Sequence, residues 1–232
     1  MSATIISTTR PEGDPTAAET GGGPVRLTDQ ATGTLPDQAE STPPDQTTGT
    51  RLDKAIGTLA VAFAADPVIR WLLPDGGRYI AHFPRLLRLV GDVAAGAGAV
   101  DTMGSGAGAA IWIAPGTHLP EEEFAGLLQQ SVAAARLDDA FALLEQMDLY
   151  HPEQPHWYLP FIGVDPLHQG RGHGSALLRT SLARCDREGL PAYLEASSPR
   201  NRALYERQGF QVVAEARVAD CPPLWPMWRP AR

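Results

Sequence analysis

The sequence predicts an α/β or α+β fold, in which helices flank a central mixed sheet. Helical periodicity comes first, over residues 51–95, and two short β-like runs follow it. Strand and helix patterns then alternate from residue 156 to residue 229. Hydrophobic residues make up 43% of the 232-residue chain, which is enough to bury a core around such a sheet.

Residues 1–50 differ in composition from the rest and are predicted to be a disordered, low-complexity tail. They are rich in Thr, Pro, Gly and acidic residues, and they repeat the tripeptide Pro-Asp-Gln. Such a segment buries too little apolar surface to offset the entropy lost on ordering. We therefore expect residues 51–232 to form the folded domain.

The folded part is expected to begin with three helices. Residues 51–66 place apolar side chains at helical spacing, Asp66-Pro67 starts a short helix over residues 68–73, and residues 77–95 form a third. Two β-like runs follow, over residues 98–104 and 107–115, with a hairpin turn at residues 104–106. Pro120 and three glutamates open a helix that runs to about residue 137, and a further helix covers residues 139–149.

The C-terminal half carries the most informative pattern. Residues 156–164 are typical of a buried strand, a glycine-rich loop follows, and a helix over residues 173–188 ends at Gly189. A strand at 191–196 precedes a short helix at 201–209, for which Asn201 is a candidate N-cap. The last strands are expected at 210–218 and 224–229.

Charge and composition limit the classes of molecule that the protein is expected to bind and the compartment in which it is expected to lie. The net charge of −8 argues against a nucleic-acid binder, which needs a basic face, and is compatible with a cationic small molecule. The sequence contains no run of eighteen apolar residues, and its N-terminus lacks the pattern of a signal peptide. Cys185 and Cys221 are too few for a disulfide framework. We expect a cytoplasmic protein without a membrane span.

The loop 164-VDPLHQGRGHGSALL-178 has glycines at 170, 172 and 174, a pattern that usually holds a phosphate against the backbone. A nucleotide phosphate loop needs a lysine after the last glycine, where Ser175 stands. A dinucleotide loop turns directly off its strand, whereas residues 165–169 intervene here, and too little chain follows Glu195 for a doubly wound sheet. A coenzyme A pyrophosphate and a solvated glycine turn remain as interpretations.

The run Gln169-Gly170-Arg171-Gly172-His173-Gly174 resembles the acyl-CoA loop of the GCN5-related N-acetyltransferases, the GNAT family. The stretch 194-LEASSPRNRALYERQGFQVV-213 resembles the family's C-terminal block of Asn, Tyr and Gly-Phe. Stretches spread over most of residues 55–229 resemble the branch that includes puromycin N-acetyltransferase. The resemblance implies a GNAT fold, whose mixed, mostly antiparallel sheet is splayed at the cofactor site.

The resemblance also implies acetyl-CoA as co-substrate and assigns residues to the reaction. Tyr205 would donate a hydrogen bond or proton to the departing thiolate, and Glu195 would act as base or anchor the acceptor ammonium. A core tyrosine, a solvated strand-end acid and deprotonation through water are the alternative interpretations. The residues expected to bind the cofactor are Ile162, Gly163 and Val164 of the strand, the loop residues Gln169, Gly170, Arg171, Gly172, His173, Gly174 and Ser175, and Asn201, which would otherwise only cap its helix.

Other polar and sulfur-containing residues are expected to play no part in the reaction. His151 and His156 are separated in the sequence and have no partners at metal-ligand spacing, so no metal site is expected. His173 is expected to be exposed, and Cys185 to lie inert on the apolar face of its helix.

We expect the protein to acetylate the amine of a small molecule. An aminonucleoside antibiotic or a related metabolite is the acceptor that the resemblance suggests, and it would imply a role in antibiotic resistance. A peptide or protein N-terminal acetyltransferase and a non-catalytic acyl-CoA-binding module on the same fold are the alternatives. The protein is expected to be a monomer or a homodimer.

Overall fold

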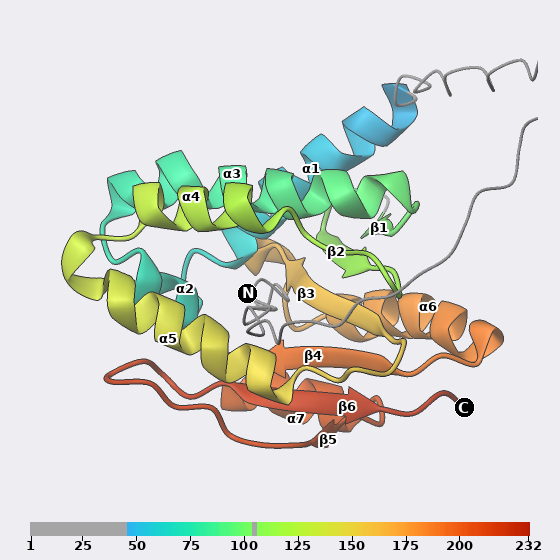
Figure 1. Ribbon diagram of the computed structural model, residues 1–232. Helices are drawn as coiled ribbons and strands as arrows, with labels where there is room; N and C mark the ends of the chain where they lie inside the picture. Colours follow the sequence, from blue (N-terminus) through green and yellow to red (C-terminus); the bar gives the residue numbers. More distant parts are fainter. Residues whose placement is uncertain (1–45, 104–105) are drawn as a thin grey trace, which may run out of the picture. The chain divides into compact units, whose positions relative to one another are not determined.

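A computed structural model describes residues 46–103 and 106–232 (Figure 1). The expected tail lies outside these residues up to position 45, as do Gly104 and Ser105 of the expected hairpin turn. Helix α1 (Gln46–Ala62) begins ahead of the expected start at Arg51.

The next elements follow the predicted order. They are α2 (Pro67–Leu72), α3 (Gly76–Gly96), β1 (Val100–Thr102) and β2 (Gly108–Ile113), and the two strands pair antiparallel. Asp66 caps α2, where its side chain accepts hydrogen bonds from the backbone N–H groups of Val68 and Ile69. Asp75 caps α3 in the same way. These side chains satisfy N–H groups that a helix leaves without an internal partner.

The boundary between the next two helices differs from the prediction. Helix α4 (Glu121–Ser131) ends well before residue 137, and α5 (Ala134–Tyr150) starts before residue 139. Val132 is buried in an extended conformation, and the guanidinium of Arg78 donates a hydrogen bond to the Ser131 carbonyl at 3.2 Å. Tertiary contacts therefore end α4, because the alanine-rich sequence holds no glycine or proline at this point.

The C-terminal half contains β3 (Trp157–Val164), the 3-10 turn η1 (Pro166–His168), α6 (His173–Glu188), β4 (Ala192–Ala196), α7 (Pro199–Glu206), β5 (Gln211–Val212) and β6 (Trp225–Arg229). Two predictions here are wrong. Ser198, and not Asn201, caps α7, because its hydroxyl accepts the Asn201 N–H. The strand expected at 210–218 shrinks to two residues, with an isolated bridge between Ala216 and Leu224.

The sheet has the order β1-β2-β3-β4-β6-β5. Among the strands of the described residues, β3 and β4 are the one parallel pair, so the prediction of a mixed, mostly antiparallel sheet is confirmed. Their register contains two residue pairs, Trp157 with Ala192 and Tyr158 with Tyr193. Beyond these pairs the two strands separate, which opens the sheet at their carboxyl ends.

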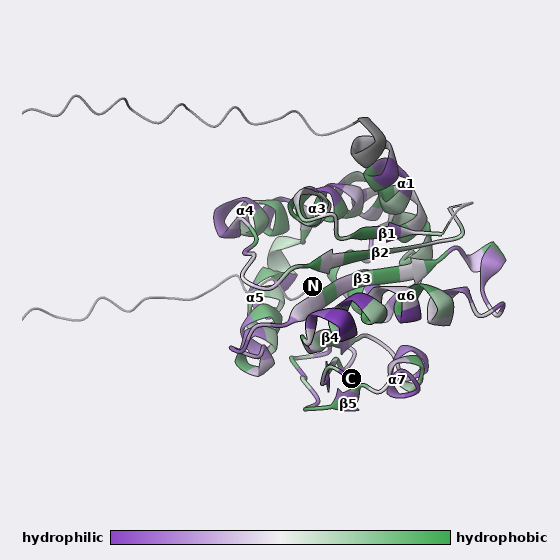
Figure 2. Ribbon diagram, turned by 90° about the vertical axis from the view of Figure 1, so that its right-hand side faces the viewer, coloured by the Kyte–Doolittle hydropathy of each residue, from purple (hydrophilic) through white to green (hydrophobic). Residues whose placement is uncertain are grey.

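Helices cover both faces of the sheet (Figures 1 and 2). Ile111 of β2 faces α3, where a Cβ at Gly91 would come within 3.6 Å of its Cδ1 atom. The next residue, Trp112, faces α6, and the guanidinium of Arg184 lies 6.0 Å from its ring. Since neighbouring strand residues point to opposite faces, α3 and α6 lie on opposite sides. Figure 2 shows mixed polarity on α1 and α3 and a largely hydrophobic β2.

The core lies between β2, β3 and the first helices. Phe161 of β3 makes an edge contact with Phe63 and another with Phe83 of α3. Such aromatic pairs stabilise a core beyond their buried area. None of the helices in the described ranges is both long and apolar enough to cross a membrane.

Candidate active site

A cavity of about 590 Å³ opens where β3 leaves β4. Its walls come from the end of α1, the carboxyl end of β3, the glycine loop, the start of α6, and α7. The cavity contains Tyr205 and every residue expected to bind the cofactor except Arg171. These lining residues are Ile162, Gly163, Val164, Gln169, Gly170, Gly172, His173, Gly174, Ser175 and Asn201.

The glycine loop presents bare backbone to this cavity. Gly170 and Gly172 have φ angles of 76° and 80°, a left-handed conformation that favours glycine. Gly172 is the N-cap of α6, and no side chain caps this helix. Its first N–H groups are therefore available to an anion, and the positive end of the helix dipole lies beside them. A pyrophosphate fits this arrangement.

Hydrogen bonds hold the loop in shape. The Gln169 side chain donates to the Val164 carbonyl at 3.1 Å, and the Asp165 carboxylate accepts the Leu167 N–H at 2.8 Å. The side chain of Gln169 therefore stabilises the loop itself. Arg171 is exposed and lies outside the cavity wall.

The edge of β3 offers backbone groups to a ligand. Ile162 and Gly163 pair with β2 on one side, while the β4 side carries no register pair beyond Tyr158. An extended chain with amide groups can hydrogen-bond to such an edge as an added strand. The pantetheine arm of coenzyme A is a chain of this kind.

Gly163 also lies in close contact with α1. A Cβ atom here would lie 2.6 Å from the Cβ atom of Ala62 and 3.2 Å from Cδ2 of Leu59. The missing side chain therefore makes room for α1, and the part of Gly163 in cofactor binding stays a prediction.

Tyr205 is buried in α7, and its ring makes an edge contact with Phe210. Burial raises the pKa of its hydroxyl above the usual value, and the charge of Asp66 raises it further. The hydroxyl therefore keeps its proton at neutral pH and can act as a donor.

Asp66 is a cavity residue that sequence reasoning did not place in the site. Besides capping α2, it accepts a hydrogen bond from the Ser197 hydroxyl after β4. Burial raises the pKa of its carboxyl despite these hydrogen bonds. The pair Asp66-Pro67 indicated a helix start in the sequence. The contact between Asp66 and Ser197 could not be recognised there, because it joins residues far apart in the chain.

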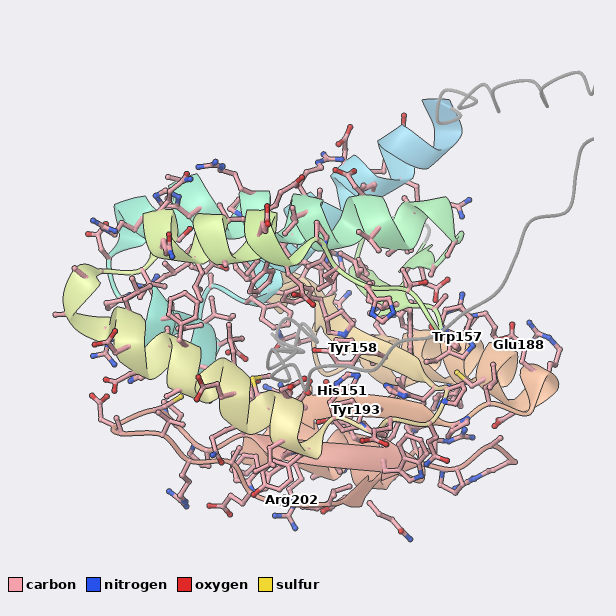
Figure 3. The ribbon with its side chains drawn as sticks, viewed as in Figure 1. His151, Trp157, Tyr158, Glu188, Tyr193 and Arg202 are labelled. Carbon is pink, nitrogen blue, oxygen red and sulfur yellow. The ribbon has the colours of Figure 1, made fainter. Side chains whose placement is uncertain are left out.

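Glu195 does not line the cavity. It shares a face of β4 with Tyr193, and burial and the charge of Glu195 raise the pKa of the Tyr193 hydroxyl. The His151 ring at the end of α5 packs against Tyr193 on that face, as Figure 3 shows. The opposite face of β4 carries Ala192 and looks toward α6 and α7. Arg229 of β6 pairs with Ala192, so it lies on that face, and its side chain binds Asp186 of α6. Glu195 and the glycine loop therefore approach the strand gap from opposite sides.

Two histidine expectations are also changed. His173 is half-buried and lines the cavity. His151 and His156 lie together, with their Nε2 atoms 3.1 Å apart. Across residues 46–103 and 106–232, no group of three or more His, Cys, Asp or Glu side chains is arranged to hold a metal ion.

Helix α6 starts at a glycine without a side-chain cap, beside two parallel strands that separate, as the resemblance to acyl-CoA-dependent N-acyltransferases implies. The comparisons agree with this class. Residues 119–210 match the model of the Acetyltransferase (GNAT) family. An uncharacterized N-acetyltransferase of Schizosaccharomyces pombe is 29% identical over 171 residues, which are 66% of this chain and 68% of that protein. A mycothiol acetyltransferase of Beutenbergia cavernae is 41% identical over 76 residues, which span 32% of this chain but 26% of that protein.

Solved structures share the fold. A Corynebacterium glutamicum structure described as histone acetyltransferase HPA2 and related acetyltransferase has a TM-score of 0.57 and 27% identity, covering 79% of this chain and 92% of its own. Arylalkylamine N-acetyltransferase 2 from Aedes aegypti has a TM-score of 0.59 and 15% identity, covering 79% and 96%, and shows the fold alone. Residues 119–210 thus carry the pattern of the GNAT acetyltransferase family, and the protein is an acyltransferase. The puromycin branch stays a prediction.

Proposed function

We propose that the protein transfers the acetyl group of acetyl-CoA directly to the amine of a small molecule. The observation that carries this proposal is the single cavity shared by the glycine loop, the open edge of β3 and Tyr205. Acetyl-CoA supplies an activated acyl group as a thioester. The chain's own residues bind its pyrophosphate, align its amide-bearing arm and supply a proton.

Each group has one task in this proposal. The N–H groups at the start of α6 bind the pyrophosphate, and the backbone of Ile162 and Val164 aligns the arm along β3. Glu195, on the other side of the gap, accepts the proton of the acceptor ammonium, and Tyr205 gives a proton to the departing thiolate. Direct transfer needs both partners bound at once, and in this proposal they bind on opposite faces of the gap.

The acceptor is proposed to be a small amine, an aminonucleoside or a related metabolite. The mycothiol acetyltransferase of Beutenbergia cavernae is named for a small acceptor, which supports this proposal. Placement of α5 over the Glu195 face supports an enclosed acceptor site, because His151 at its end packs on Tyr193. The Corynebacterium glutamicum structure, described as a histone acetyltransferase, favours a second candidate, a peptide or protein amine.

An acceptor screen tests the proposal. The full chain is mixed with acetyl-CoA and a panel that contains puromycin, arylalkylamines, amino sugars and short peptides, and the free thiol is measured. We expect thiol release with at least one small amine and a matching acetylated product by mass spectrometry. Release with peptides alone would favour the second candidate. Acetyl-CoA binding without release for any amine would favour a non-catalytic acyl-CoA-binding module.

A further inference from the structure

The sheet face under α5 holds a cluster of titratable side chains that acetyl-CoA binding does not use. The cluster comprises His151, His156, Tyr158, Tyr193 and Glu195, and is called the histidine–tyrosine cluster. Figure 3 shows His151, Tyr158 and Tyr193 side by side. Tyr193 is fully buried, and His156 is 9% exposed.

Contacts connect the cluster from the strand gap to the surface. The charge of Glu195 acts on the Tyr193 hydroxyl two residues before it on the same strand face, and the His151 ring meets Tyr193 edge-on with centroids 4.8 Å apart. The Nε2 atoms of His151 and His156 are 3.1 Å apart. His156 Nδ1 lies 2.7 Å from the carbonyl oxygen of Gln154, an exposed residue. The cluster therefore links a residue at the reaction gap to solvent.

The hydrogen bonds fix the tautomers of the two neutral rings. A carbonyl oxygen can only accept, so Nδ1 of His156 carries its proton and Nε2 is an acceptor. Nε2 of His151 must then donate to it, which leaves Nδ1 of His151 as a lone pair. This nitrogen and the Tyr193 hydroxyl are both buried and have no hydrogen-bond partner within the described residues. An unsatisfied acceptor and an unsatisfied donor therefore belong to two rings that contact each other.

Burial keeps the pair uncharged at rest. It lowers the pKa of His151 to about 4, with His156 as a further cause, and it also lowers the pKa of His156. The groups that face the pair are Tyr158 and Tyr193 from the strands and Trp228 of β6, while the carboxylates of Glu195 and Asp148 act on Tyr193. A proton that reaches the imidazoles is passed on and not stored.

We propose that the histidine–tyrosine cluster conducts to solvent the proton that the acceptor amine loses, a proposal that rests on the proposed function. The N–H bond of the ammonium breaks as the Glu195 carboxylate takes the proton. Glu195 passes it to the Tyr193 oxygen while the Tyr193 hydroxyl gives its own proton to Nδ1 of His151. The Nε2 proton of His151 moves to Nε2 of His156, and the Nδ1 proton of His156 leaves to water near Gln154. One proton enters, one leaves, and exchange with water restores the tautomers.

The kinetic test uses the full chain with the best amine from the acceptor screen. His151→Gln and His156→Gln should lower kcat by about tenfold or more at pH values where the amine is protonated, because deprotonation then limits turnover. The deficit should shrink as the pH rises and the free amine becomes abundant, while the KM for acetyl-CoA stays unchanged. His118→Gln, an exposed histidine outside the cluster, is the matched control.

Further readouts separate conduction from packing. Imidazole in the assay should partly restore His151→Ala, which a lost packing contact would not allow. Histidine NMR of the native protein should show His151 titrating far below the usual range, and a titration near the usual value would contradict the cluster geometry. If the native enzyme is active and His151→Gln has the same pH profile as the native enzyme, the relay is overturned while the proposed function stands. Absence of thiol release with every amine would instead overturn the proposed function and the relay with it.

Discussion

A hydroxyl at position 205 can act as a proton donor only if it keeps its proton at the pH of turnover. Burial and Asp66 both raise its pKa, so this condition is met. We expect Tyr205→Phe to lower kcat by about 100-fold, within the usual range for a lost general acid. The dissociation constant of acetyl-CoA, measured by calorimetry, should change little because the ring remains. Unchanged turnover would remove Tyr205 from the chemistry.

Asp66 allows a pH prediction at a single residue. Its folded pKa is raised above the unfolded value, so its contribution to stability is full below the unfolded pKa and is lost as the pH rises through the folded pKa. Asp66→Asn keeps a capping oxygen but removes this dependence. The variant's unfolding free energy relative to the native protein should therefore increase from about pH 4 to pH 8.

Chemical denaturation at several pH values measures this difference. Asp75→Asn is the matched control, because Asp75 also caps a helix but is exposed. A difference between Asp66→Asn and the native protein that stays flat with pH would contradict the prediction.

Residues of the candidate site were predictable where neighbouring residues in the sequence form a recognisable pattern. The glycine loop and Tyr205 lie in short, recognisable patterns, and the cavity contains both. Asp66 and the His151–His156 pair were missed because their contacts come from distant parts of the chain. The contact of Gly163 with α1 was also missed, because it too joins distant parts of the chain.

At the scale of elements, the close approach of α1 to β3 gives a prediction. A Cβ at Gly163 would meet Ala62 at 2.6 Å, so Gly163→Ala must push the helix from the strand. Overpacking of this kind costs about 1–3 kcal/mol of unfolding free energy. Gly57→Ala, on the exposed side of the same helix with open space around it, should instead stabilise by about 0.5–1 kcal/mol. Denaturant titration of both variants checks the pair, and an equal effect would contradict it.

Most helices and strands were predictable because the spacing of their hydrophobic residues is clear. The errors lay at the ends of these elements. Helix α4 stops at Ser131 because Val132 is buried and Arg78 binds the last carbonyl. Strand β5 is short because only Gln211 and Val212 pair with β6. Both outcomes depend on neighbours in space, which periodicity does not report.

For the whole molecule, ligand binding should be visible as stability. Acetyl-CoA at 100 times its dissociation constant should raise the unfolding free energy by about 2.7 kcal/mol, because it binds the folded chain. Calorimetry should then show a higher melting temperature. Acetyl-CoA should raise the unfolding free energy of Gly172→Val by less. The φ of 80° at this position disfavours a β-branched residue, and the new side chain would cover the loop backbone. An equal gain would show that the loop does not bind the ligand.

The sheet is joined across its middle by two residue pairs of β3 and β4. On either side of this join, five residue pairs connect β2 with β3 and five connect β4 with β6. Because the join has fewer residue pairs, it should open at a lower free energy than its neighbours in the sheet. The place where the reaction is proposed to occur would then be the first part of the sheet to lose its native order.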